Sequence, residues 1–426
     1  MNSNTKSTGR SIGLFKQSMI AIVVLAVVQG CGEGGSSSVG TDYGQAADSG
    51  SGGVDYDHTQ LLANLADNII LPTYQSFQTN TVAQTVSLNA YCDALAAGDA
   101  DLPTQQQSAQ NHWKTLSAVW QQAEMMQIGP LSANQHALRN TIYSWPVVSA
   151  CGVDQDVVYF QQGNINGTQY QISQRTDTRR GIDALEHLLF SQNLNHSCNG
   201  NVGPLGDWNI RTDMERMIAR CDFAIVVADD INQNATTLVN AWSGDSGYAA
   251  KLKSAGENGS DFETSLQGVN AISDAMFYLD SVTKDGKLGK PLGKKDNSCA
   301  NAVCPSDVES ALSAQSVEHI VANVVGFSKL FYGSQSGLAD GEGVGFDDYL
   351  IAVGDEQTAL RITQGLLEMQ QLADQLQMPL AELLVTDAAQ VEALYARIKV
   401  VTDEMKTSFI TSLALDLPQT SAGDND

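Results

Sequence analysis

The feature that most constrains the fold is the helical spacing of apolar residues, which begins near His58 and dominates the chain from there on. The stretch 213–242 is rich in Ala, Ile and Val and contains neither Gly nor Pro, so it predicts one long helix. Segments that alternate polar and apolar residues are scarce, which argues against a sheet domain. One apolar stripe at helical spacing is formed by Trp113, Leu116, Trp120 and Ala123. We therefore predict an all-α protein built from helical bundles.

The same periodicity predicts the organisation of the chain. Its 426 residues are enough for two or three ordinary domains. Two short strings, Gly181-Ile182-Asp183 and Gly345-Phe346-Asp347, each open a predicted helix and suggest two bundles related by duplication. We expect one bundle over 58–245, a second over 246–415 and a flexible tail over 416–426. The predicted helices cover 111–127, 177–191, 213–242, 262–283, 307–332, 346–377 and 389–415, and long non-helical stretches are expected over 192–207 and 286–305.

The N-terminus resembles a bacterial lipoprotein signal. Three basic residues precede a ten-residue apolar run over 19–28, which is short for a transmembrane helix. The run leads into Val28-Gln29-Gly30-Cys31, similar to a lipobox whose Cys becomes the lipidated first residue. The alternative is an ordinary signal peptide with an incidental Cys. We expect a signal peptide over 1–30 and a Gly/Ser-rich tether over 31–57, which would hold the protein at the cell envelope. The outer membrane, on its periplasmic or outer face, is the expected location.

The charge balance excludes one class of partner. Against 48 acidic residues stand only 23 Lys and Arg, which gives a formal net charge of −25. Nucleic-acid binding requires clustered cations that neutralise phosphates, so we expect no nucleic-acid partner. An acidic surface concentrates cations without selecting one of them.

Six cysteines remain after Cys31, and an even number in an exported protein suggests disulfides. Cys299 and Cys304 are close enough in sequence to close one loop, and we predict that pair. The other four can pair in three ways, which the sequence does not distinguish; they are Cys92, Cys151, Cys198 and Cys221. A zinc site is the rival interpretation, but no pair has CxxC spacing.

The most informative predicted helix is the segment 181–190, which carries Asp183, Glu186 and His187. Glu186 lies at the edge of the apolar face, and Asp183 lies one turn before it. A carboxylate that borders a core is costly unless it is paired, protonated or bound to a cation. Two carboxylates and an imidazole on one strip could therefore bind a metal ion. In the alternative, Arg179 or Arg180 pairs with Asp183 and Glu186 hydrogen-bonds to a neighbouring helix.

Glu124 has a comparable setting, because it follows the apolar stripe that contains Trp120 and precedes Met125. We include it as a further candidate metal ligand. The alternative is an ordinary exposed acid on a helix.

The order of several motifs resembles the imelysin family. These motifs are Asn68-Ile69-Ile70-Leu71-Pro72, Trp120 with Glu124 and Gly129-Pro130, Ser144-Trp145-Pro146, the helix after Gly181, and Lys287-Leu288-Gly289-Lys290-Pro291-Leu292-Gly293. The resemblance covers about 58–415. It implies two helical bundles and an exported bacterial protein, often a lipoprotein. The family was named for a proposed metallopeptidase and is related to periplasmic components of iron uptake.

The resemblance also implies a site, the signature GxHxxE, whose His and Glu are proposed metal ligands. Gly181 and Glu186 match this signature, but Asp183 replaces the His. Two carboxylates form a harder oxygen site than hydrolytic zinc requires. His187 could restore some nitrogen ligation, although it lies roughly 100° around the helix from Glu186. We therefore expect a divalent or ferric metal ion, with iron favoured and zinc or calcium as alternatives.

The sequence leads to three alternative hypotheses for the function. The first is an envelope lipoprotein that binds a metal ion or a metal-bearing ligand in iron uptake, attached to the membrane by its lipid anchor and working with an outer-membrane or periplasmic transport partner. The second is an imelysin-type metallopeptidase, which the loss of the signature His disfavours. The third is a non-catalytic scaffold that binds a partner protein.

Overall fold

The computed structural model describes residues 56–200, 202–419 and 421. The predicted signal peptide, Cys31 and nearly all of the predicted tether therefore lie outside the described residues. The described residues belong to one compact unit. Among them, no helix is both long and apolar enough to cross a membrane.

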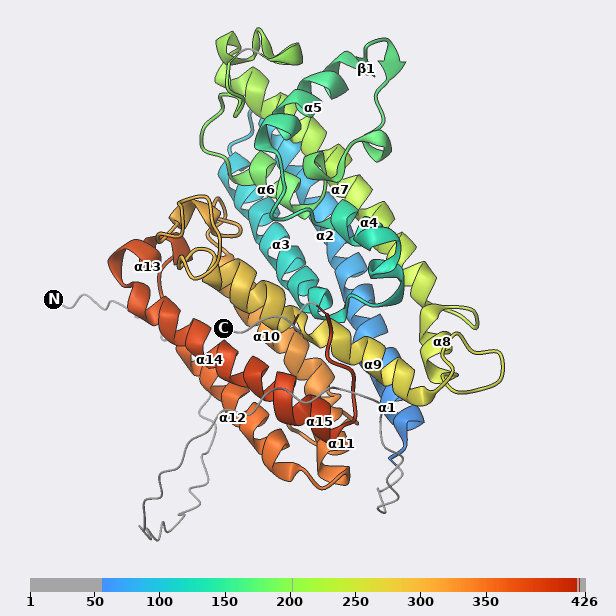
Figure 1. The fold of residues 1–426 in the computed structure, drawn as a ribbon. Coiled ribbons are helices and arrows are strands. Elements are labelled where there is room, and N and C mark those ends of the chain that lie inside the picture. Colours follow the sequence, from blue (N-terminus) through green and yellow to red (C-terminus); the bar gives the residue numbers. More distant parts are fainter. Residues whose placement is uncertain (1–55, 201, 420, 422–426) are drawn as a thin grey trace, which may run out of the picture. The chain divides into compact units, whose positions relative to one another are not determined.

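The described residues form an all-α fold, as predicted (Figure 1). Of three long helices, α2 (Leu71–Ala97) packs against both α3 (Leu102–Ala123) and α7 (Asp213–Trp242). Around them lie α1 (His58–Asn64), its π-helical extension η1 (Leu65–Ile70), α4 (Ala133–Ile142), α5 (Ala150–Gln162), α6 (Ile182–Phe190) and α8 (Tyr248–Lys253). A small antiparallel hairpin joins β1 (Asn164–Ile165) to β2 (Thr168–Gln169).

The second half of the chain supplies the other group of helices. Here α10 (Ser316–Tyr332) packs against both α3 and α12 (Glu356–Ala373), and α12 packs against α14 (Ala388–Glu404). This group is completed by α9 (Ser265–Met276), the π-helix η8 (Leu279–Gly289), α11 (Phe346–Ala352), α13 (Leu380–Thr386), η10 (Met405–Phe409) and α15 (Ile410–Ser412). Single 3₁₀ turns lie at Glu124–Met126, Gly129–Leu131, Ile172–Gln174, Asp177–Arg179, Gly203–Leu205, Trp208–Ile210 and Pro305–Asp307. The domain limits at 58–245 and 246–415 stay predictions.

Local sequence explains where the long helices begin and end. The helix α7 begins with a capping box. The Thr212 hydroxyl oxygen accepts from the Glu215 backbone N–H, and the Glu215 carboxylate accepts from the Thr212 backbone N–H. The helix α2 ends at Gly98, whose φ of +62° suits a residue without Cβ. The stripe predicted on α3 is buried along its whole length. These helices are therefore held by both capping and core packing.

Several predicted helix limits were wrong. The expected helix 346–377 is two helices, because Gly354 turns the chain with φ +88° and Asp355 caps α12 by accepting from the Thr358 N–H. The expected helix 307–332 begins only at Ser316, after a turn region in which Ser310 and Ala314 have positive φ. The expected loop 286–305 starts inside η8, which continues to Gly289.

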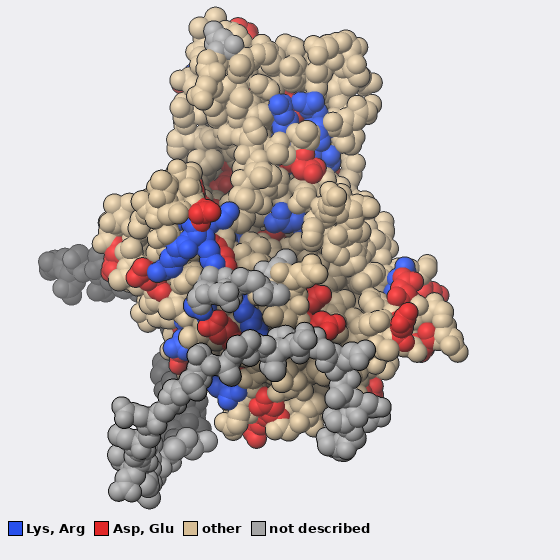
Figure 2. All heavy atoms as spheres, in the orientation of Figure 1, with Lys and Arg blue, Asp and Glu red and all other residues tan. Residues whose placement is uncertain are grey.

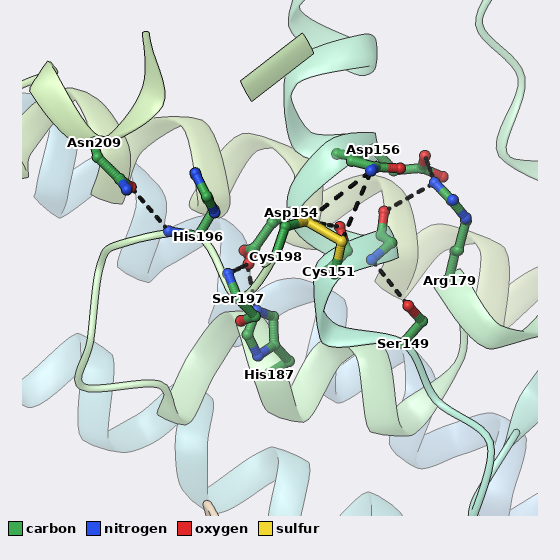
Figure 3. The surroundings of a disulfide bond; sticks show 12 residues. Ser149, Cys151, Asp154, Asp156, Arg179, His187, His196, Ser197, Cys198 and Asn209 are labelled. Atoms are coloured by element: carbon green, nitrogen blue, oxygen red, sulfur yellow. Dashed lines mark hydrogen bonds and ion pairs between the residues drawn. A yellow bond between two sulfur atoms is a disulfide. The ribbon is translucent and has the colours of Figure 1, made fainter. Parts of the chain in front are cut away.

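All six candidate cysteines are paired. The predicted disulfide Cys299–Cys304 is confirmed. The pairing that the sequence left open is Cys92–Cys221, which links α2 to α7, and Cys151–Cys198, which links α5 to the loop after α6. Figure 3 shows the second of these among hydrogen-bonded side chains.

Charged side chains lie in small, separate groups on the face drawn in Figure 2. Groups of Lys and Arg lie close to groups of Asp and Glu, and uncharged residues cover most of that face. The excess of acid over base is therefore not gathered into one acidic region on this side.

Candidate functional site

The helix α6 carries three of the predicted site residues and is buried along its whole length. It begins after Gly181, whose φ is +91°. A Cβ at this position would lie 2.7 Å from the carbonyl oxygen of Ile142, closer than packed atoms allow. Glycine is therefore required both by the backbone conformation and by the close approach of α4. The helix predicted over 177–191 begins later than expected, at Ile182, because Arg180 is in extended backbone.

Asp183 is a buried carboxylate without a cationic side chain bonded to it among the described residues. Its Oδ2 accepts a 2.7 Å hydrogen bond from the Ser144 hydroxyl. Burial raises the pKa of Asp183 to about 7, and the hydrogen bonds from Ser144 only partly oppose this. Arg179 binds Asp156, and Arg180 binds Asp230. The alternative in which one of these arginines neutralises Asp183 was therefore wrong.

Glu186 is the second buried carboxylate on the same helix. Its Oε1 accepts a 2.8 Å hydrogen bond from the backbone N–H of Ser313. Burial raises the pKa of Glu186, an effect that the Ser313 hydrogen bonds and the nearby His319 oppose. The segment that precedes α10 thus holds Glu186 in place without neutralising it.

His187 lies apart from these two carboxylates. Its Nε2 is 3.0 Å from Oδ1 of Asp154, which belongs to α5 (Figure 3). The other oxygen of Asp154 accepts from the backbone N–H of Ser197, beside the Cys151–Cys198 disulfide. Arg220 also contacts Asp154 at 3.1 Å. His187 is thus engaged in a polar network that joins α5, α6 and α7.

Glu124 is fully buried, so the alternative of an ordinary exposed acid was wrong. Its Oε1 contacts Nη2 of Arg139 at 2.9 Å. Its Oε2 accepts a 2.5 Å hydrogen bond from the Tyr278 hydroxyl and lies 3.6 Å from Nζ of Lys287. Glu124 is therefore already compensated by two cationic side chains.

Sequence reasoning missed the residue at the centre of this network. Lys287 of η8 is 1% exposed, and its Nζ lies 3.1 Å from Oε1 of Glu309 and 2.8 Å from Oδ1 of Asn323. It also donates to the side chain of Gln121. We call the group formed by Gln121, Glu124, Tyr143, Lys287, Glu309, His319 and Asn323 the central polar cluster.

Glu309 connects the central polar cluster to α6. Its Oε1 accepts a 2.6 Å hydrogen bond from the Tyr143 hydroxyl, and its Oε2 lies 3.3 Å from Nδ1 of His319. Although burial alone raises the pKa of Glu309, the charges of Lys287 and His319 lower it to about 2. Glu309 is thus held ionised close to Glu186, whose pKa it raises.

The two pairs of carboxylates have opposite electrostatic environments. Glu124 and Glu309 are neutralised by Lys287 and Arg139, so they have little attraction left for a metal ion. Asp183 and Glu186 receive hydrogen bonds from neutral groups. Within 56–200, 202–419 and 421, no group of three or more His, Cys, Asp or Glu side chains is placed to hold a metal ion. Any cation site on α6 would therefore consist of two carboxylates completed by neutral oxygens or water.

Comparison with known proteins assigns this chain to a family. Residues 70–405 match the family model described as Imelysin. This chain belongs to the imelysin family. The resemblance drawn from the sequence motifs is thereby confirmed.

Named relatives agree with this assignment. The chain is 22% identical over 287 residues to "Iron-regulated protein A" of Synechococcus elongatus, covering 66% of this chain and 67% of that protein. Its fold is similar to that of an imelysin-like protein from Psychrobacter arcticum, with a TM-score of 0.58 and 17% identity over 86% of this chain and 100% of the other. It is also similar to a proposed iron-regulated protein A precursor from Parabacteroides distasonis, with a TM-score of 0.61 and 17% identity over 84% and 98%.

Proposed function

We propose that this imelysin-family protein is a cell-envelope lipoprotein that binds a metal ion or a metal-bearing ligand and takes part in iron acquisition. The observation that carries the proposal is the pair of buried, uncompensated carboxylates on α6. Burial without a cationic partner penalises the ionised forms of Asp183 and Glu186. A bound cation removes that penalty, so binding would be coupled to loss of protons.

The donor set favours hard cations. Carboxylate oxygens from Asp183 and Glu186, with hydroxyl oxygens such as that of Ser144 nearby, suit iron, manganese or calcium better than soft metals. Two relatives are described as iron-regulated protein A, which supports iron among these cations. His187 would not contribute unless it left Asp154. The absence of a signature His at position 183 continues to disfavour a peptidase.

Glu186→Gln should weaken metal binding at least tenfold and abolish the metal-dependent rise in melting temperature. A ligand stabilises only the state that binds it, by about 2.7 kcal/mol at a hundredfold excess over Kd. Titration calorimetry and thermal unfolding with Mn²⁺, Ca²⁺, Zn²⁺ and anaerobic Fe²⁺ would measure both effects. The matched control is Asp222→Asn, which removes an exposed carboxylate from α7.

A pH series makes this test specific. The folded-state pKa of Asp183 is raised to about 7, so its contribution to apo stability is present at acid pH and is lost as pH rises from about 4 to about 7. Metal competes with that proton, and affinity should therefore increase with pH through 7. Asp183→Asn should flatten this dependence. Equal metal binding by wild type, Glu186→Gln and Asp183→Asn would rule out the site on α6, and EDTA-sensitive proteolysis by wild type would support the peptidase instead.

The envelope location is proposed from the signal-like N-terminus and the three disulfides, which persist in oxidising compartments. The word "precursor" in the description of one structural relative agrees with export. We expect acylated Cys31 at the mature N-terminus, detectable by mass spectrometry of the membrane fraction. Cys31→Ala should release the protein into the soluble periplasmic fraction, and a variant that stays membrane-bound would contradict lipid anchoring.

A further inference from the structure

A cavity of about 840 Å³ lies next to the central polar cluster and is not used by the proposed metal site. On one side it is bounded by the turn Gly129–Leu131 and by α4, and on the other by α9 and η8. Pro418 and Gln419 complete its edge, in the C-terminal segment that runs past α9 in Figure 1 and bonds to it from the Asp416 N–H to Asn270. The volume is typical of sites for small organic molecules.

The walls of the cavity are largely aromatic. Trp145, Tyr248 and Tyr278 line it. Gly129 allows the Tyr248 ring to lie against the backbone, because a Cβ there would lie 2.5 Å from that ring. Flat aromatic surfaces of this kind favour a ligand that itself carries a ring.

The lining of the cavity, unlike the chain as a whole, contains more basic than acidic side chains. Arg139, Lys290 and Lys295 line it, together with two acids, Asp274 and Asp285. Asp285 lies 3.3 Å from Nζ of both Lys284 and Lys295, so its charge is already compensated. In a chain with about twice as many acidic as basic residues, this cavity has more cations than anions. Two of these cations are already paired, Arg139 with Glu124 and Lys295 with Asp285. Lys290 is exposed and makes no ion pair among the described residues, so it is the lining cation that can attract an anionic group.

The rim of the cavity contains an unusual backbone segment. Asn134, Gln135 and His136 are three successive residues with φ between +52° and +61°, a left-handed turn inside the span of α4. Such residues without a glycine cost about 1–2 kcal/mol each. The turn places His136 at the cavity, and strained segments that persist tend to lie at functional sites.

We propose that this cavity binds a small organic anion with an aromatic body. The aromatic walls would hold the ring system, and Lys290 would hold the anionic group. This site is separate from Asp183 and Glu186 on α6, although Arg139 and Tyr278 touch Glu124 and so connect the cavity to the central polar cluster. Loss of metal binding on α6 would therefore leave this proposal standing.

The test compares two fluorescent probes in the presence of EDTA, which keeps the metal site out of the measurement. One probe is 8-anilinonaphthalene-1-sulfonate, an aromatic anion, and the other is N-phenyl-1-naphthylamine, its neutral analogue. Wild type should bind the anion more tightly than the neutral probe. Ala275→Trp, which fills the cavity from α9, should weaken the binding of both probes at least tenfold. Ser281→Trp fills it from η8 and replaces the first variant if that one unfolds.

The charge part of the proposal has a matched pair of variants. Lys290→Gln removes an exposed cation from the cavity, and Lys294→Gln removes one nearby that pairs with Glu392 and does not line it. Lys290→Gln should weaken the binding of the anionic probe about two- to fivefold and leave the binding of the neutral probe unchanged. Lys294→Gln should change neither. Equal binding to wild type and to the folded filled variant would overturn the proposal, and so would an equal effect of Lys290→Gln on both probes. Tighter binding of the neutral probe would indicate an apolar or peptide occupant and would also overturn it.

Discussion

Replacing Lys287 by Met should destabilise the folded protein by about 3–5 kcal/mol, the cost of removing one partner from a buried ion pair. Nζ of Lys287 lies within 3.6 Å of carboxylates from both Glu124 and Glu309. Met fills a similar volume but leaves Glu309 without its main compensating charge. Equilibrium unfolding in urea at neutral pH would measure the loss.

Two further measurements separate this cause from a simple packing defect. Adding Glu309→Gln to Lys287→Met should recover part of the lost stability, because the uncompensated charge is removed. The lowered pKa of Glu309 contributes stability above about pH 4.5 that is lost as pH falls toward 2, so the gap between wild type and Lys287→Met should narrow in that window. A gap that is independent of pH, with no rescue by Glu309→Gln, would mean that shape and not charge holds the cluster together.

Removing the disulfide between Cys92 and Cys221 should lower the free energy of unfolding by about 5 kcal/mol. This is the largest loss expected among the three disulfides. The bond spans a sequence separation of 129 and restricts a large part of the unfolded chain. The separation of Cys299–Cys304 is only 5, and the same chain-entropy argument gives about 2 kcal/mol for it. Both pairs should be replaced by Ala and compared by equilibrium unfolding without reductant. Equal losses would show that local strain or packing, and not loop length, decides the effect.

Sequence reasoning predicted what depends on local pattern. The period of apolar residues predicted α3, α6, α7 and α10, and the short spacing of Cys299 and Cys304 predicted their disulfide. The break between α11 and α12 was missed, although a signal was present. Gly354 followed by Asp355 is a typical helix end next to a typical helix start.

The central polar cluster could not be predicted in the same way. Lys287 and Glu309 belong to residue types that are usually exposed, so their burial has no local signature. Lys287 is 166 positions from Gln121, and His319 is 202 positions from Ser117, with which it also bonds. Only the packing of α10 against both α3 and η8 brings these residues together. For the same reason, the environment of Asp183 could not be inferred from the arginines adjacent to it in sequence.

The π-helical form of η8 has a consequence for how this region tolerates insertions and deletions. A π-helix closes its hydrogen bonds one residue later than an α-helix does, so each of its turns holds an additional residue. Deleting a single position between Leu279 and Lys287 would allow the segment to relax toward an α-helix. The residue removed would then be the additional one, so the side chains that follow would stay close to their present orientation about the axis. Lys287 would still face Glu309, and a one-residue deletion here should be tolerated better than one inside an α-helix, where it turns the following side chains by roughly 100°.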